Sequence, residues 1–217
     1  ELIEAAMDIA KKAVSGFEGR YIAFDIGPTG RLMAPLGDLD FEEAVAIYSD
    51  NIRLAARLGA DLIIIETMND CHETKAAVIA AKESCKLPVI VSNAYDRQGK
   101  LMTGASVAAM VAILEGLRVD AFGLNCSFGP DVALEIVDEF AAVSSTPIIA
   151  MPNAGLPRVE NGSTVYDVST EEFSEYMVSL AKKGVSILGG CCGTTPEFIK
   201  KTIEKTKDIP VKPISQK

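Results

Sequence analysis

Three of the five cysteines come soon after apolar runs and could bind a metal ion together. Cys126 follows the run at 121–124, and the adjacent pair Cys191 and Cys192 follows the run at 185–188. Thiolates are preferred ligands of Zn²⁺, and three protein ligands with an open fourth position are typical of a catalytic zinc site. Glycines on both sides of the pair let the backbone turn tightly enough for two adjacent residues to face one ion. One hypothesis is therefore a catalytic zinc site.

The competing hypothesis is that these cysteines only pack. Free cysteine is among the most buried residue types and behaves as a small hydrophobe, and the chain has no C-x-x-C spacing that would signal zinc. Cys71 and Cys85 lie in or near a predicted helix, so we expect them to be packing residues. His72, the single histidine, falls in the first turn of a helix, where we expect no ligand role. Residue types and spacing alone leave both hypotheses open.

Short apolar runs alternate along the chain with longer segments of helical periodicity. Six runs suit strands that are buried on both faces, at 21–26, 61–65, 88–92, 120–124, 147–151 and 185–188. Apolar residues three and four apart predict helices at 1–14, 41–58, 73–84, 106–117, 132–142, 173–182 and 197–205. Strict alternation of this kind predicts a parallel sheet with helical crossovers, in one domain over residues 1–207.

Polar side chains follow four of the predicted strands at the carboxyl end: Glu66, Asn93, Asn125 and Asn153. In a (β/α)₈ barrel that edge gathers functional groups from many strands, whereas a doubly wound sheet concentrates them at one switch point. The pattern therefore favours an α/β fold of the TIM-barrel type. Because only six strands are predicted, two of the eight that closure needs are missing.

Charge and hydropathy exclude two classes of partner. The 217 residues include 30 acids and 21 Lys plus Arg, a net charge of −9, which disfavours nucleic acid and anionic membrane surfaces. The uncharged stretch at 101–114 is shorter than the roughly 20 residues that span a bilayer. No signal peptide is evident, and five cysteines form no small-domain disulfide pattern. We expect a reducing, cytoplasmic location.

Three motifs make the sequence similar to a known family. They are GGCCGTTPE starting at Gly189, GLNCS starting at Gly123, and DLIIIET starting at Asp61. Together they resemble the homocysteine S-methyltransferase domain, and the resemblance runs from about residue 5 to residue 205. The segment PNAGLP, starting at Pro152, is most similar to the homocysteine domain of cobalamin-dependent methionine synthase.

The resemblance implies a (β/α)₈ barrel in which Cys126, Cys191 and Cys192 bind Zn²⁺, with the homocysteine sulfur as the fourth ligand. The methyl donor is then methylcobalamin, carried by another domain of a polypeptide that also has a folate-binding domain. Glu66 is expected to pair with the substrate ammonium, the alternative being a structural acid. Asn153 is expected either to contact the substrate or to form a turn, and Asn125 to orient the neighbouring cysteine.

Two other functions stay open at this stage. One is a stand-alone methyltransferase that uses S-methylmethionine, S-adenosylmethionine or betaine. The other is a zinc-free barrel fragment that acts only by pairing with a partner chain, which metal content would distinguish. Relative to the family, the first two strands and their substrate-binding loop are missing, so we expect exposed sheet edges and a chain that can fold yet be inactive alone. Residues 208–217 are expected to form a tail or linker.

Overall fold

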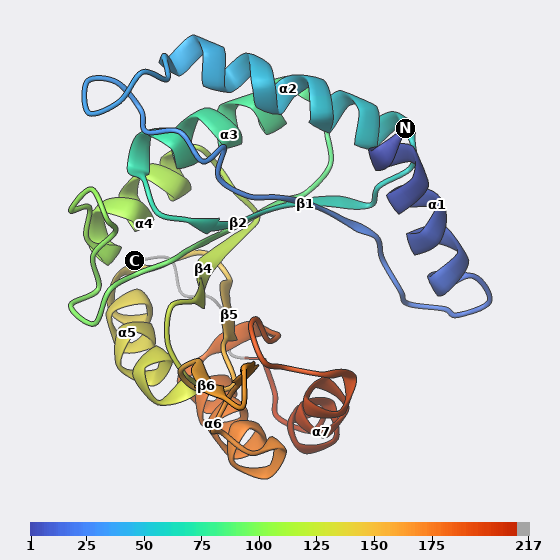
Figure 1. Ribbon diagram of the computed structural model, residues 1–217, viewed down its shortest axis with the longest axis vertical. Coiled ribbons are helices and arrows are strands. Elements are labelled where there is room, and N and C mark those ends of the chain that lie inside the picture. The colour runs from blue at the N-terminus through green and yellow to red at the C-terminus, as the bar shows by residue number, and fades with distance from the viewer. Residues whose placement is uncertain (212–217) are drawn as a thin grey trace.

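The computed structural model describes residues 1–211 and shows strands and helices alternating along an arc (Figure 1). The helices are α1 (Leu2–Val14), α2 (Phe41–Arg57), α3 (Cys71–Ser84), α4 (Val107–Gly116), α5 (Pro130–Val143), α6 (Thr170–Lys183) and α7 (Pro196–Thr206). The strands are β1 (Ala23–Ile26), β2 (Leu62–Met68), β3 (Val89–Asn93), β4 (Ala121–Cys126), β5 (Ile148–Pro152), β6 (Arg158–Glu160), β7 (Ser163–Val165) and β8 (Val185–Leu188). The predicted alternation is confirmed, and each predicted element lies within a few residues of its expected bounds.

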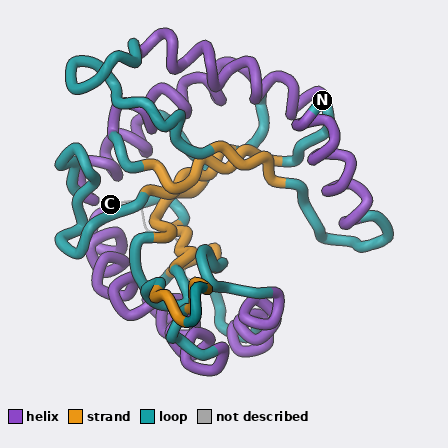
Figure 2. The backbone as a smooth tube through the Cα atoms, in the orientation of Figure 1, coloured by secondary structure: helices purple, strands orange, loops and turns teal. Residues whose placement is uncertain are grey.

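Within the described residues, six parallel strands form one sheet in the order β1-β2-β3-β4-β5-β8. The strands line the inside of the arc, and the helices lie on its outside (Figure 2). β1 pairs only with β2 and β8 only with β5, so the barrel is not closed. The α/β barrel prediction is therefore confirmed, with six strands where a closed (β/α)₈ barrel has eight.

The main core lies between the outer face of the sheet and the helices. In β2, Ile63 and Ile65 are fully buried, whereas Ile64 between them faces the other way and is only partly covered. This alternation follows from the two-residue period of a strand. Phe122 of β4 and Phe140 of α5 belong to the same core, with ring centroids 5.9 Å apart. Packing of the helices against the outer face therefore stabilises the sheet, and the inner face is available for polar groups.

Local signals in the sequence fix several element ends. The side chain of Asp70 accepts a hydrogen bond from the backbone N–H of Glu73 at 2.8 Å, as expected for a helix N-cap. Gly184 ends α6 in the left-handed conformation with φ of 112°. Thr195 makes no side-chain capping bond, so Pro196 at the first helical position is the start signal of α7.

The antiparallel hairpin of β6 and β7 is absent from the sequence prediction. Asn161 and Gly162 form its turn with φ of 50° and 78°. An Asn-Gly pair is the strongest short-range hairpin signal, so the sequence did contain the information. The strands have three residues each and are largely exposed, which is why they left no apolar run.

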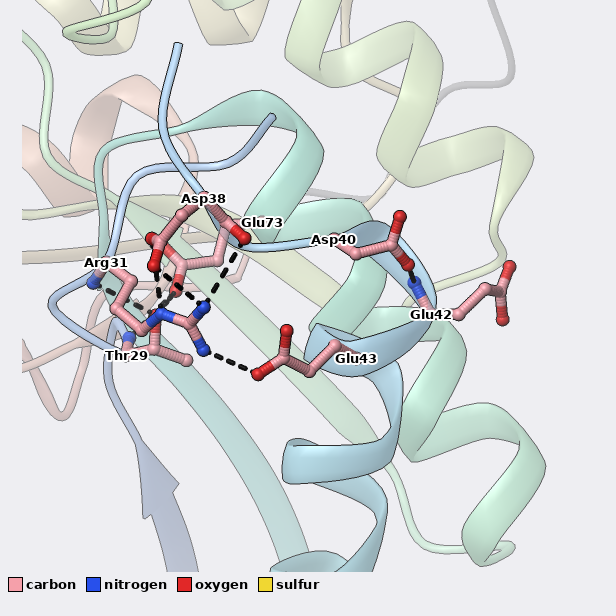
Figure 3. Close-up of polar contacts among 7 residues, drawn as sticks. All are labelled: Thr29, Arg31, Asp38, Asp40, Glu42, Glu43 and Glu73. Carbon is pink, nitrogen blue, oxygen red and sulfur yellow. Dashed lines mark hydrogen bonds and ion pairs between the residues drawn. The ribbon is translucent and has the colours of Figure 1, made fainter. Parts of the chain in front are cut away.

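A buried carboxylate on α3 anchors the loop between β1 and α2. One oxygen of Glu73, Oε1, accepts hydrogen bonds from the backbone N–H and the hydroxyl of Thr29, both at 2.7 Å, and from the hydroxyl of Tyr48 at 2.9 Å. Arg31 of the same loop pairs with Glu43 of α2 at 2.6 Å (Figure 3). The loop is thus attached to both helices at the barrel mouth.

The first helix packs beside α2, and the last one beside α6 (Figure 1). Met7 of α1 is buried in a small cluster with Ile22 and Ala55. Among the described residues, every helix is too short or too polar to cross a membrane. Of the predicted tail 208–217, residues 212–217 lie outside the described part of the chain.

Candidate metal centre

The three predicted cysteine ligands lie together at the carboxyl end of the sheet. The Sγ atoms of Cys126, Cys191 and Cys192 are all within 4.8 Å of one another, and those of Cys126 and Cys192 are 3.8 Å apart. Zn–S bonds of about 2.3 Å in tetrahedral geometry place two sulfurs about 3.8 Å apart. The donor set and its spacing therefore fit one tetrahedral metal ion that keeps a fourth position for another ligand.

Cys126 ends β4 in an unusual backbone conformation. Its φ is 57°, and that of Ser127 is 59°, in the left-handed region that residues with a Cβ rarely adopt. The N–H of Phe128 donates to the Cys126 carbonyl at 2.7 Å, and the Phe128 carbonyl accepts from the N–H of Asn153 at 3.0 Å. This tight turn brings the Cys126 sulfur toward the loop that follows β8.

The cysteine pair is attached to the end of β5. The N–H of Cys191 donates to the carbonyl of Pro152 at 2.9 Å. Gly193 follows the pair with φ of 80°, and a Cβ at this position would lie 2.3 Å from the ring of Tyr166. A glycine is required there both by the backbone conformation and by the aromatic ring.

Hydrogen bonding within the cluster shifts the pKa values of Cys126 and Cys191 in opposite directions. A hydrogen bond from the Cys191 thiol, helped by the backbone N–H of Ser127, lowers the pKa of Cys126 to about 5. The pKa of Cys191 is raised, because it shares its proton with the Cys126 sulfur and is partly buried. Since thiolates are the form that binds metals, the cluster offers one thiolate at neutral pH before any cation arrives.

Asn125 lies directly behind the cysteines and is 1% exposed. Its Oδ1 accepts hydrogen bonds from the N–H of Thr67 and the hydroxyl of Ser92, both at 2.8 Å. Its Nδ2 donates to the Thr67 hydroxyl at 2.7 Å and faces the Cys191 sulfur at 3.8 Å. The amide thus connects β2, β3, β4 and the loop after β8.

Asn153, predicted to contact substrate or form a turn, lies against the cysteines and is 4% exposed. Its Oδ1 accepts a hydrogen bond from the N–H of Cys192 at 3.0 Å. Its side chain also donates to the Cys126 sulfur, which helps to lower the pKa of that thiol. Asn153 therefore holds both cysteine segments at once.

Glu66 lies half-buried at the carboxyl end of β2, next to the cluster. Burial raises its pKa, and the nearby Asp25 carboxylate and Cys126 sulfur add to the effect. In the described part of the chain its carboxylate has no Lys, Arg or His ion-pair partner. A partly desolvated carboxylate of this kind favours a ligand that brings a positive charge.

Comparison with known proteins establishes the family. The sequence profile described as homocysteine S-methyltransferase matches residues 1–206. The chain belongs to the homocysteine S-methyltransferase family. The resemblance that the three sequence motifs predicted is therefore confirmed.

Methionine synthases are among the curated relatives of this family member. The chain is 30% identical to that of Mycobacterium leprae (strain TN) over 201 residues, which cover 90% of this chain and 17% of the relative. It is also 30% identical to that of Mycobacterium tuberculosis (strain ATCC 25618 / H37Rv) over 210 residues, or 94% of this chain and 18% of the relative. The chain spans less than a fifth of the length of these relatives.

Solved structures support the fold of the family member. The apo form of the homocysteine methyltransferase MmuM from Escherichia coli superposes with a TM-score of 0.78 at 22% identity, covering 94% of this chain and 73% of that one. Its metallated form gives a TM-score of 0.76, again at 22% identity, covering 95% and 70%. At this identity the likeness supports the barrel architecture.

Several residues near the cysteine cluster were not predicted from the sequence. Asp25 lies one position before the end of β1 and carries the same signal as Glu66, a carboxylate near the end of an apolar strand. Tyr166, which donates to the Cys192 sulfur, follows the unpredicted hairpin and had no signal. Thr67 and Ser92 are connected to the site by their hydrogen bonds to the amide of Asn125, which the sequence does not reveal.

The other cysteines and the histidine stay apart from the centre. Cys71 and Cys85 pack partly against the main core, as predicted. His72 is exposed at the start of α3. Among the residues that the structure describes, the three cysteines of the centre form the single group of His, Cys, Asp or Glu side chains spaced for a metal ion.

Proposed function

We propose that this chain is a zinc-dependent homocysteine S-methyltransferase domain in which Cys126, Cys191 and Cys192 hold Zn²⁺. Homocysteine is the methyl acceptor, and methionine is the product. The observation that carries the proposal is the sulfur spacing, 3.8 Å between Cys126 and Cys192, in a member of this family. Soft thiolate donors in this geometry suit zinc, and the open fourth position suits a substrate thiol.

The bound metal supplies Lewis acidity, which keeps the homocysteine sulfur deprotonated at neutral pH. The chain's own residues provide the rest. Cys126, Cys191 and Cys192 would hold Zn²⁺ as thiolates with a net charge of about −1, which would leave a substrate sulfur bound beside them electron-rich. Asn125 and Asn153 hold the cysteines in place.

Glu66 is proposed to receive the ammonium group of homocysteine. It is half-buried beside Cys126, and a cation would relieve the cost of keeping it ionised. Asn153 is proposed as a further polar contact at the same edge, in addition to its bond to Cys192. The substrate would then be oriented by its ammonium at one end and its sulfur at the other.

The proposed methyl donor is methylcobalamin carried by another domain. The related methionine synthases are more than five times as long as the matched segment, which leaves room for cobalamin-binding and folate-binding domains. In this arrangement residues 1–207 are the barrel domain, and 208–217 are a tail or linker toward the next domain. Five free thiols favour a reducing compartment, and we propose the cytoplasm.

Zinc stoichiometry in competition with a chelator tests the ligand assignment. Wild type should retain one Zn²⁺ per chain, and Cys126→Ala should lose it. Cys85→Ala is the matched control, because Cys85 is a half-buried cysteine outside the cluster. Full occupancy in Cys126→Ala would refute the assignment, and absence of zinc binding in reduced wild type would favour a fragment that acts only by pairing.

Methyl transfer tests the donor. The full-length protein, loaded with zinc and given homocysteine, should form methionine from methylcobalamin. Formation of methionine only from S-methylmethionine, S-adenosylmethionine or betaine would instead identify a stand-alone enzyme.

A further inference from the structure

The strand that carries Glu66 is irregular at that residue. Pairing between β2 and β3 is in register up to Ile65 and resumes with a shift at Met68. Both Ile65 and Met68 are fully buried in the same core. An ordinary strand would place residues three apart on opposite faces, so the extra residue is a bulge. The bulge turns both Glu66 and Thr67 away from the outer core.

Thr67 has a backbone conformation that its side chain disfavours. Its φ is 59°, and for a β-branched residue the left-handed region is a genuine outlier. Such strained conformations persist where several surrounding contacts hold the residue in place, and they are concentrated at functional sites. Something in the structure must therefore hold Thr67 in place.

The buried amide of Asn125 provides that constraint. It forms two hydrogen bonds with Thr67, accepting from the backbone N–H at 2.8 Å and donating to the hydroxyl at 2.7 Å. Ser92 donates to the same Oδ1 at 2.8 Å, which fixes the amide orientation. The bonds reach across β3, because Thr67 and Asn125 lie on strands that are not neighbours in the sheet. The bulge is thus fastened to the strand end that carries Cys126.

The same amide also faces the metal centre. Its Nδ2 lies 3.8 Å from the Cys191 sulfur, and Asn125 directly precedes Cys126 in the chain. One side chain therefore contacts both the thiolate cluster and the residue next to Glu66.

We propose that Thr67 and Asn125 form a clamp that aims the Glu66 carboxylate at the substrate position beside the cysteine cluster. The inference rests on the proposed function, in which Glu66 receives the homocysteine ammonium. Thr67 is a positioning residue and touches no substrate. Without its hydroxyl the left-handed conformation loses one of its two restraints, the bulge relaxes, and the carboxylate turns away.

The clamp predicts a change in selectivity, which loss of fold would not mimic. Zinc-loaded protein is titrated with homocysteine and with 4-mercaptobutyrate, which has the same thiol and carboxylate but no ammonium. Wild type should bind homocysteine at least tenfold more tightly. Thr67→Val should reduce this preference below threefold and change the 4-mercaptobutyrate affinity by less than threefold. Thr67→Ser keeps the hydroxyl and should restore the preference.

The matched control is Thr202→Val on α7. Thr202 is 4% exposed, and its hydroxyl has no hydrogen-bond partner among residues 1–211, so the same substitution there should leave both affinities unchanged. A tenfold preference that survives in Thr67→Val would overturn the clamp. Equal affinities of wild type for the two thiols would overturn it together with the role of Glu66.

A second readout needs no homocysteine and separates the clamp from the proposed function. If wild type binds neither thiol, the proposed function fails for this chain, and the clamp is judged with Co²⁺ in place of Zn²⁺. Thr67→Val and Asn125→Ala should each shift the thiolate-to-cobalt absorption band, and the double variant should shift it no further than Asn125→Ala. Independent, additive shifts, or no shift in Thr67→Val, would overturn the clamp.

Discussion

The sulfur atoms of Cys126 and Cys192 lie 3.8 Å apart although 66 residues separate them in the chain. Two parallel strands with β5 between them bring them there, each ending at the same edge of the sheet. Hydrogen bonds within the cluster lower the pKa of Cys126 to about 5, so a negative charge is present at this edge at neutral pH. A cation bound by all three sulfurs would connect β4 to the loop after β8.

Zinc should therefore stabilise the folded chain. At a free zinc concentration 100 times the dissociation constant, linkage gives about 2.7 kcal/mol of added stability. Urea denaturation with and without zinc measures this difference. Cys126→Ser should lose most of it, and Cys85→Ser should keep it. An equal gain in Cys126→Ser and wild type would place the zinc elsewhere.

Removing the charge of Glu66 should weaken homocysteine binding more than zinc binding. Glu66→Gln keeps the shape and loses a hydrogen bond to a charged group, which costs about 1.5–3 kcal/mol, or roughly tenfold to hundredfold in affinity. Calorimetric titration of zinc-loaded protein measures both constants. Glu83→Gln, exposed on α3, is the control. Unchanged homocysteine affinity would make Glu66 a structural acid, and lost zinc would make it a metal ligand.

The free energy of unfolding should depend on pH through the titration of Asp25. Partial desolvation raises the pKa of this carboxyl, with a backbone hydrogen bond opposing the shift. A carboxyl whose folded pKa exceeds its unfolded pKa stabilises the fold most below the unfolded value, about 3.9, and this stabilisation is lost as pH rises through the folded pKa. Asp25→Asn does not titrate, so it should gain stability relative to wild type between about pH 3.5 and pH 7. Denaturation at both pH values, with exposed Asp8→Asn as control, measures the gain, and a constant difference would contradict it.

The carboxylate of Glu73 should be among the costliest side chains to remove. It is 2% exposed and accepts three hydrogen bonds on one oxygen, two of them from Thr29. Glu73→Ala would leave both donors of Thr29 without this acceptor, and we expect a loss of about 3 kcal/mol in the free energy of unfolding. Tyr48→Phe removes one of the donors and should cost about 1 kcal/mol. Equal costs for the two variants would show that the loop is not anchored through Glu73.

The open sheet should make this chain self-associate. β1 and β8 each have one unpaired edge among the described residues, and unpaired edges invite pairing with another chain. Exposed apolar side chains also lie on and just after α1, the helix that precedes β1, among them Ile9 and Phe17. Light scattering should show a mass that rises with concentration, and Ile9→Lys with Phe17→Lys should reduce the rise. A monomer at all concentrations would contradict this expectation.

The alternation of strands and helices and the three candidate ligands could be predicted from local sequence patterns. The apolar runs at 120–124 and 185–188 had to be buried, so the cysteines that follow them had to lie at strand ends. Parallel strands place those ends at one edge, which is why Cys126, Cys191 and Cys192 could be predicted as a group. These features depend on local pattern and on the periods of regular structure.

The connections among the polar groups around the cysteines could not be predicted in this way, because they form only in the folded chain. The bulge at Thr67, the reach of Asn125 across β3, and the approach of Tyr166 to Cys192 each depend on residues far apart in the chain. Hydrogen bonds of this kind leave no period in the sequence, because an amide or a hydroxyl is bonded by whichever partner the packed strands bring within about 3 Å. Sequence patterns therefore predict where the ligands lie, whereas side-chain orientation is fixed only when the sheet has assembled.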